Sequence, residues 1–439
     1  MIDLVVRNAR LGAPSESTEH EGLVDILIDG DRIAAINPTT DHPPDARTVI
    51  NAAGSLVSAP YVDPHVHLDA TLTAGEPRWN ESGTLWEGIA CWSERKPMLT
   101  REDVISRAEE VLRWYAANGT LHVRSHVDVT DPNLVALDAL LEVRDRVKDV
   151  IGLQLVAFPQ EGICSFPDGD KLLEEAARRG VDVIGAIPHF EDTREDGVAS
   201  IEIAMEIAQR YGLLVDAHCD EIDDEQSRFI EVLATRAHRS GMRDRVTASH
   251  TTAMGSYNAA YSAKLHRIIA RSGINMVCNP VVNLHLQGRF DSYPTRRGLT
   301  QVKELLAAGV NVAFGNDDIM DPWFPMGTGN ATLLAYVGAL ATQLTSPSEV
   351  AECFRMVTDR PADVLGLADR YGIAPGRPAS FIVLPAANAF DVVRRQVRPT
   401  HVVAHGALVA TAPTSVTTLT WPGRDAEQID FVRQRDRSL

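Results

Sequence analysis

Two histidines stand one residue apart, His65 and His67, in the stretch YVDPHVHLD that runs from 61 to 69. In a β-strand, residues i and i+2 point to the same face, so both imidazoles would be directed at one point. A strand end that does this offers two nitrogen ligands to a metal such as Zn²⁺ or Fe²⁺. Two ordinary loop histidines would look the same, so the motif gains weight only from other groups in the chain.

Side chains with metal-binding or acid–base chemistry also follow four later strands of the predicted fold. They are Gln160 and Glu161, then His218, Asp220 and Glu221, then His250, and finally Asp317 and Asp318. Chance would scatter such groups along the chain. Their position at five strand ends therefore favours one shared site.

The residue types fit a metal-assisted hydrolysis. Three neutral imidazoles and one carboxylate can bind a divalent cation and leave a position for water, whose pKa the cation lowers from ~15.7 toward ~7. The predicted metal ligands are His65, His67, His218 and Asp317. Glu221, three residues past His218, is the predicted proton shuttle, and His250 can hold or polarise the hydroxide.

The predicted acids also have structural explanations. Asp317 could cap the start of a helix, a role that Asp318 could fill equally well. Glu221 lies in an acidic run from 220 to 225 that could be a solvated helix start. The site assignment therefore depends on whether the tertiary structure brings these side chains to the histidines.

Several neighbouring residues are left outside the predicted site. Cys219 alternates away from His218 and is expected in the core, and the other histidines are taken as structural, although His126 and His189 could support the ligands from behind. Residues 186–191, after the fourth barrel strand, contain no lysine that could be carbamylated to bridge two metals, so one metal is expected. The HFE motif there matches part of another zinc deaminase signature, but no PCxxC follows.

A barrel would bring the strand ends together. From 56 to 370, short apolar strands alternate with amphipathic helices, and glycines such as Gly119 and Gly212 follow helices as C-caps do. The predicted strands are 57–65, 121–129, 151–159, 182–188, 213–219, 245–249, 274–278 and 310–315, and the clearest helices are 103–118, 170–179, 199–211 and 300–308. Eight such units predict an α/β fold, the (β/α)8 TIM barrel.

Strand-like segments at both ends predict a second, smaller unit. They cover 4–9, 24–28, 32–36, 379–384 and 401–409, and the tail after Thr411 shows no clear period. Residues 1–55 and 371–439 are therefore predicted to form one composite small β-sandwich domain, and 56–370 the metal-dependent catalytic domain.

The composition indicates a globular protein and argues against binding to nucleic acid or anionic membranes. Hydrophobic residues at 44% and charged residues at 23% are ordinary for a globular chain, while a net charge of −18 argues against binding to nucleic acid or an anionic membrane. No signal peptide and no transmembrane run is recognisable. The five scattered cysteines make no CxxC pair, which suits a reducing cytoplasm.

Longer segments carry a resemblance to a known family. They are PHVHLDATLTAGEPRWNESGTLWEGI (64–89), VAFPQEGI (156–163), GAIPHFEDTRE (185–195), HCDEIDDEQSRF (218–229), ASHTTAM (248–254), NLHLQGRFDSYP (283–294) and FGNDDIMDPW (314–323). Along nearly its whole length the chain resembles the amidohydrolase superfamily, and within it the bacterial cytosine deaminases.

The resemblance implies hydrolytic deamination of cytosine to uracil and ammonia at a single Fe²⁺ or Zn²⁺. The family's ligands match His65, His67, His218 and Asp317, its proton shuttle matches Glu221, and its residue beside the attacking water matches His250. Substrate contacts match Gln160, the backbone at Leu85, Asp318 and Trp323. In this scheme hydroxide attacks C4, with Glu221 passing protons to N3 and to the leaving amino group. A homo-oligomer is also implied.

Alternatives remain open at this stage. The chemistry could act on 5-methylcytosine, isocytosine, isoguanine, creatinine or an s-triazine, because pocket size decides between rings and one methylene changes binding by only about 1–3 kcal/mol. A non-catalytic scaffold with the same fold is the rival from another class, although such proteins typically lose their metal ligands. Trp79, Trp86 and Trp92 could cover the pocket or simply pack a loop, and Asn316 departs from the histidine that is usual there.

Overall fold

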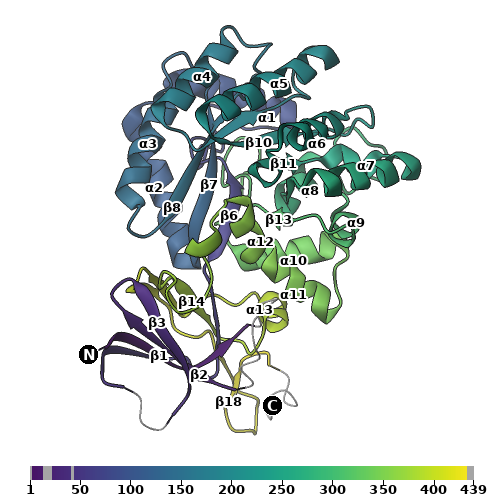
Figure 1. Cartoon of the computed structure of the whole chain (residues 1–439). Helices are drawn as coiled ribbons and strands as arrows, with labels where there is room; N and C mark the ends of the chain where they lie inside the picture. The colour runs from purple at the N-terminus through teal and green to yellow at the C-terminus, as the bar shows by residue number, and fades with distance from the viewer. Residues whose placement is uncertain (1, 13–21, 41–43, 433–439) are drawn as a thin grey trace.

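A computed structural model describes residues 2–12, 22–40 and 44–432. Its larger part is a parallel eight-stranded barrel surrounded by helices (Figure 1). In chain order and in spatial order the barrel strands are β6 (Tyr61–Val66), β7 (Thr120–Asp128), β8 (Gly152–Phe158), β9 (Val183–Ala186), β10 (Leu214–Cys219), β11 (Val246–His250), β12 (Asn275–Cys278) and β13 (Val312–Phe314). A bridge between Val66 and Asp317 brings the last strand back to the first. The predicted TIM barrel is confirmed.

The structure has the four helices predicted by range and adds others. The helices are α1 (Leu85–Arg95), α2 (Arg101–Asn118), α3 (Val135–Val147), α4 (Gly169–Arg179), α5 (Arg194–Tyr211), α6 (Phe229–Ser240), α7 (Ala259–Ser272), α8 (Pro280–Leu286), α9 (Val302–Ala307), α10 (Ala331–Thr342), α11 (Pro347–Arg355), α12 (Asp359–Val364) and α13 (Ala389–Arg395). The four predicted by range correspond to α2, α4, α5 and α9. Gly119 ends α2 and Gly212 ends α5, each in the left-handed conformation that favours glycine. One apolar core joins the helices to the barrel strands.

A second sheet combines the two ends of the chain, with the strand order β16-β15-β14-β5-β1-β2-β3 and β4 paired to β1 (Figure 1). Its strands are β1 (Ile2–Leu11), β2 (Val24–Asp29), β3 (Arg32–Pro38), β4 (Ala46–Asn51), β5 (Leu56–Ser58), β14 (Phe381–Leu384), β15 (His401–Ala404) and β16 (Ala407–Thr411). The sheet has an apolar core of its own. The predicted small β unit from both termini is confirmed, whereas the exact domain limits stay a prediction, and residues 1, 13–21, 41–43 and 433–439 lie outside the described part.

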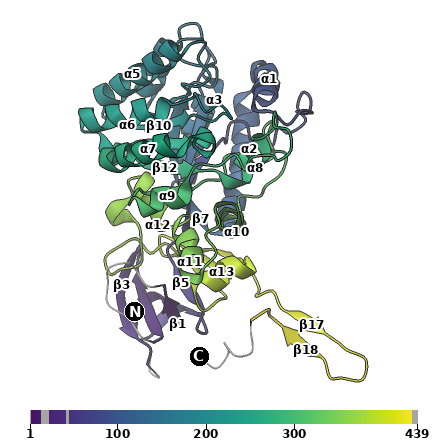
Figure 2. The ribbon, with the colours of Figure 1, turned by 90° about the vertical axis from the view of Figure 1, so that its right-hand side faces the viewer.

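Two details differ from the sequence prediction. The first predicted strand, 57–65, is divided at Pro60: β5 joins the small sheet and β6 starts the barrel. Proline cannot donate a ladder hydrogen bond, which explains a break there. The tail, for which no element was predicted, forms an antiparallel hairpin of β17 (Thr417–Leu419) and β18 (Glu427–Ile429) that extends away from the body (Figure 2).

No helix within the described residues is long and apolar enough to cross a membrane.

Candidate metal centre and active site

The four predicted metal ligands converge at the carboxyl ends of the barrel strands. His65 lies on β6, His67 follows it directly, His218 lies on β10, and Asp317 follows β13. One donor atom from each lies within 4.8 Å of the other three, and all four side chains are buried. Nε2 of His218 lies 3.2 Å from Nε2 of His65 and 3.2 Å from Nε2 of His67. Ring nitrogens this close repel unless a proton or a cation lies between them, so the donor set fits a divalent cation.

Local backbone geometry brings Asp317 against the histidine-bearing strand. The Asp317 N–H donates to the carbonyl of His65 at 2.8 Å, and the His67 N–H donates to the carbonyl of Asp317 at 3.0 Å. Asp317 has a φ of 69°, which turns the chain sharply at the end of β13. Just before it, a Cβ on Gly315 would lie 2.8 Å from Cβ of His65, so only glycine fits there.

Glu221 and His250 form a buried pair beside this cluster. Nδ1 of His250 lies 3.1 Å from Oε1 of Glu221 and 3.7 Å from Oδ2 of Asp317. The amide nitrogens of Asn279 and Asn283, near the start of α8, lie 3.3 Å and 3.2 Å from the same His250 nitrogen. The sequence analysis did not select these asparagines, although Asn279 directly follows the predicted strand 274–278 and its position could have indicated it.

Burial and charge separate the pKa values of these groups. Burial lowers the pKa of His65 to about 4, and burial together with the neighbouring imidazoles places the pKa of His218 well below its usual value. Burial alone would lower the pKa of His250, but the carboxylates of Glu221 and Asp317 raise it to about 9. Burial raises the pKa of Glu221. His65 and His218 are thus neutral imidazoles, as metal binding requires. Burial alone would lower the pKa of His67, but its hydrogen bond to Asp317 and the charge of that carboxylate raise it. His250 and Glu221 form a proton-carrying pair beside them.

The predicted substrate contacts lie around the same opening. Gln160 is buried two residues past Phe158, whose ring stacks on His218 with 3.9 Å between centroids. Trp323 is buried with its ring centroid 6.1 Å from that of His67, and Leu85 packs against the same apolar cluster as Trp323. Gln160 thus follows β8, Trp323 follows β13 and Leu85 starts α1, while their roles toward a substrate remain predictions.

Asp318 and Asp321 form a second acidic pair in the loop after β13. Burial, followed by the charge of Asp317, raises the pKa of Asp318 well above its usual value, and burial raises the pKa of Asp321 to about 6. Oδ1 of Asp321 accepts the backbone N–H groups of Trp323 and Phe324, both at 3.0 Å. Asp321, which the sequence analysis did not select, thus holds the loop that carries Trp323.

Glu191 holds the loop that carries Gln160. Its carboxylate accepts the N–H groups of Ile163 at 2.6 Å, Cys164 at 3.2 Å and Ser165 at 2.8 Å, and also the Ser165 hydroxyl at 2.8 Å. In the sequence, Glu191 belongs to an HFE motif that matches part of another zinc deaminase signature but lacks the PCxxC that would complete it. In the structure, the contacts of the Glu191 carboxylate hold a loop in place. A motif search could not find them, because they join two loops that are distant in sequence.

A partly buried lysine directly after α1 contacts the same loop. Nζ of Lys96 donates to Asp128 at 2.9 Å, to Thr130 at 2.8 Å and to Glu161 at 2.5 Å. Trp92 is buried and its indole N–H also donates to Asp128, at 2.9 Å. The segment after β6 is thereby fastened to the ends of β7 and β8.

The structure also places the other residues that the sequence analysis named. Trp79 and Trp86 are 55% and 39% exposed, so of the three tryptophans it is Trp92 that packs fully inside the segment. Asn316 does not touch the ligands: its side-chain amide donates to Asp63 at 2.8 Å. His126 stacks on His65 with 3.8 Å between ring centroids, and Cys219 is buried in the core as predicted.

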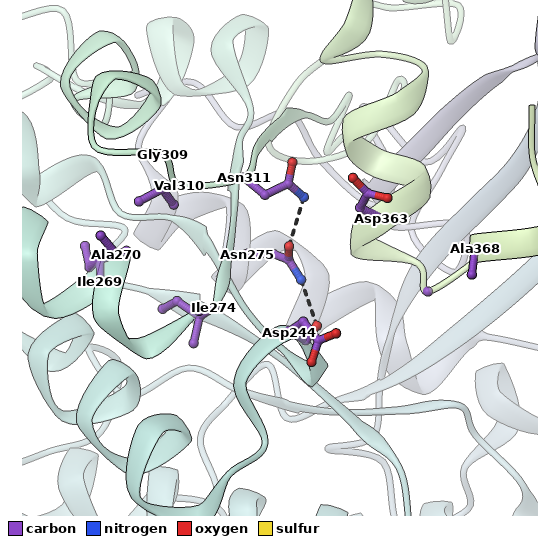
Figure 3. A pocket seen from close by; sticks show the side chains of 12 residues that line it. Asp244, Ile269, Ala270, Ile274, Asn275, Gly309, Val310, Asn311, Asp363 and Ala368 are labelled. Atoms are coloured by element: carbon purple, nitrogen blue, oxygen red, sulfur yellow. Dashed lines mark hydrogen bonds between the residues drawn. The ribbon is translucent and has the colours of Figure 1, made fainter. Parts of the chain in front are cut away.

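A cavity of about 400 Å³ lies elsewhere, where β12 and β13 begin (Figure 3). Its lining includes Asp244, Asn275, Asn311 and Asp363, and the asparagine side chains are hydrogen-bonded to each other at 2.9 Å. This is the opposite end of the barrel from the metal ligands. Strand carboxyl ends carry the chemistry in barrels of this type, so we assign no catalytic role to this cavity.

Residues 48–410 match the sequence model of the amidohydrolase family. The chain therefore belongs to the amidohydrolase family, a class of hydrolases that act on C–N bonds. Among the described residues, the three histidines and the aspartate form one group that could hold a metal ion, and two groups of three residues each share one of its members; a single metal stays a prediction.

Individual relatives refine this class. The structure of 5-methylcytosine deaminase from Klebsiella pneumoniae, liganded with 5-fluorocytosine, is 47% identical, with a TM-score of 0.91 over 96% of this chain and 100% of that one. N-isopropylammelide isopropyl amidohydrolase from Pseudomonas sp. (strain ADP) is 28% identical over 93% of this chain and 97% of its own length. Pterin deaminase from Rhizobium rhizogenes is 29% identical over 85% of each chain. The chain is thus a cytosine-deaminase-like enzyme whose relatives act on related rings.

Proposed function

We propose that this protein hydrolytically deaminates cytosine to uracil and ammonia, with 5-methylcytosine as the nearest alternative ring. The observation that carries the proposal is the Glu221–His250 pair, which lies against Asp317 and therefore beside the four convergent metal donors. Similarity to a 5-methylcytosine deaminase at 47% identity supports an aminopyrimidinone substrate.

His65, His67, His218 and Asp317 would hold the cation, either Fe²⁺ or Zn²⁺. When bound, it supplies the Lewis acidity that makes water a nucleophile at neutral pH. Asp317 would take a proton from the attacking water, and His250, whose pKa is raised to about 9, would assist by hydrogen-bonding the nucleophile. Glu221 would donate a proton to N3 of the ring and later one to the amino group.

The overall reaction balances without another reactant. The water oxygen forms a bond to C4, the bond from C4 to the amino nitrogen breaks, and the two water protons finish on N3 and on ammonia. Gln160 would orient the carbonyl edge of the ring, the backbone at Leu85 would contact it, and Asp318 and Trp323 would line its pocket. Orientation matters more than the single hydrogen bond, because it places C4 at the nucleophile.

The test measures ammonia release from cytosine, 5-methylcytosine, isocytosine, creatinine and N-isopropylammelide. Protein stripped with a chelator is reloaded separately with Fe²⁺ and with Zn²⁺. We expect no turnover in the stripped protein and the highest kcat/KM on cytosine or 5-methylcytosine. If only another ring were turned over, that ring would be the substrate and cytosine would not. Full activity of the stripped protein would overturn the metal-dependent mechanism.

Two broader features belong to the same proposal. The five cysteines are unpaired in the structure, which is compatible with function in a reducing cytoplasm. A homo-oligomer is proposed from the resemblance alone, and light scattering of the purified chain would test it.

A further inference from the structure

A continuous set of buried polar side chains crosses the interior of the barrel below the metal ligands. Arg124 on β7, Asp216 on β10, Ser249 on β11 and His65 on β6 are all fully buried. Nη1 of Arg124 donates to Oδ2 of Asp216 at 2.8 Å. The Ser249 hydroxyl donates to Oδ1 of Asp216 at 2.7 Å, and its Oγ lies 3.0 Å from Nδ1 of His65.

The far end of this set is anchored at the other end of the barrel. Nη2 of Arg124 donates to the carbonyl of Val364 at 2.8 Å and to Oε1 of Gln154 at 3.0 Å. Gln154 donates in turn to the carbonyl of Leu365 at 2.8 Å. Arg124 is thus held on two sides, and Asp216 is held by Arg124. Neither can rotate away without leaving buried charges unpaired, which is costly.

The two hydrogen bonds of the Ser249 hydroxyl determine which ring nitrogen of His65 carries the hydrogen. A serine hydroxyl has one proton, and that of Ser249 is given to Asp216. Towards His65, Oγ can therefore only accept. Nδ1 of His65 must then be the N–H, which leaves the lone pair on Nε2, the atom that lies 3.2 Å from both His218 and Asp317.

His218 provides an internal contrast. Its Nδ1 is buried and has no hydrogen-bond partner among the described residues, so no side chain fixes its tautomer in the same way. The arrangement at His65 is therefore a particular feature of that ligand and not a general property of the cluster.

We propose that Ser249, oriented by Asp216 and Arg124, is a positioning residue that holds His65 as the Nδ1–H tautomer and so presents Nε2 to the metal. The inference rests on the metal centre of the proposed function and adds the residues that prepare it. Hydrogen-bonding partners behind metal-binding histidines typically change metal affinity by about 10–100-fold.

The experiment follows zinc release to an excess of chelator from zinc-loaded wild-type protein and from Ser249→Ala, with thermal unfolding of each metal-free protein measured alongside. Ser200→Ala is the matched control, because Ser200 is an equally buried serine whose hydroxyl only donates to its own helix, at the carbonyl of Gly197. We expect release from Ser249→Ala to be about 10–100-fold faster, with Ser200→Ala at the wild-type rate.

Two conservative variants of Ser249 separate the loss of the hydroxyl from a general disturbance of the fold. Ser249→Thr keeps the hydroxyl and should release zinc at close to the wild-type rate. Ser249→Cys, a weaker donor of nearly the same size, should be intermediate and serves if the alanine variant does not fold. Wild-type release rates in both Ser249→Ala and Ser249→Cys would overturn the positioning role. Failure of the wild-type protein itself to retain zinc or iron would instead contradict the proposed function.

Discussion

The metal side and the substrate side of the site are held by different parts of the fold. On the metal side, His65 and His218 lie within barrel strands and His67 directly follows one, and His65 is hydrogen-bonded to side chains deeper in the barrel. On the substrate side, Gln160 and Trp323 lie on loops. Each loop is held by a few long-range or local polar contacts instead of a β-ladder.

This difference means that the loops proposed to select the substrate can vary while the strands that carry the metal ligands stay unchanged. Moving a strand-borne ligand would disturb the β-ladder and the packed barrel interior. A loop held by one carboxylate, such as Glu191 or Asp321, can change shape while the strands stay in place. The names of the relatives fit this division, because enzymes named for 5-methylcytosine, N-isopropylammelide and pterin match this chain over most of its length at 28–47% identity.

The largest effect is expected where the two sides meet, at Glu221. Glu221→Gln should keep the metal but lower kcat by about 10²–10⁴-fold, because the amide cannot carry protons. Metal content and steady-state kinetics measure this. Glu225→Gln, an exposed position in the same acidic run, is the control and should behave like wild type. Near-full kcat in Glu221→Gln would remove the shuttle role.

Glu191→Gln should damage the substrate side while sparing the metal side. The amide nitrogen cannot accept the N–H groups that the carboxylate now binds, so the Gln160 loop should shift. We expect kcat/KM to fall by about 10²-fold, the loss that a displacement of about 1 Å can cause, with metal content unchanged. The exposed Glu195→Gln is the matched control. Equal loss of metal would show that the two sides are not independent.

Gln160→Ala should have a smaller effect on the same side. Removing one hydrogen bond to the ring should raise KM and lower kcat together, for a loss of about 10-fold in kcat/KM. Kinetics on cytosine and 5-methylcytosine test this, with the exposed Gln209→Ala as control. An unchanged profile would mean that Gln160 does not contact the substrate.

The smallest effect is expected from packing between α1 and the loop after β13. A Cβ on Gly88 would lie 2.3 Å from Cδ1 of Trp323, so Gly88→Ala must displace the indole. We expect the free energy of unfolding, measured with denaturant, to fall by about 1–3 kcal/mol, with the metal retained. Adding Trp323→Leu should recover part of this loss, because the two residues are in contact; strictly additive losses would contradict the clash.

Much of the metal side could be predicted from the sequence because its determinants are local. Alternation directs His65, on β6, and His67, just after it, to one face of the chain. A parallel barrel brings strand carboxyl ends together, so Asp317 and His218 follow from topology. The helices were predictable for the same reason, since amphipathic periods and C-cap glycines such as Gly119 are short-range signals.

The contacts that hold the site in place were decided only by the tertiary structure. Glu191 reaches the loop at 163–165, Asn316 turns toward Asp63, and Ser249 joins Asp216 to His65. These contacts join residues that no periodicity relates. Each depends on burial, which makes an unpaired polar group costly and so selects one partner among many. The sequence therefore determined which groups carry the chemistry, and the packed barrel determined how they are oriented.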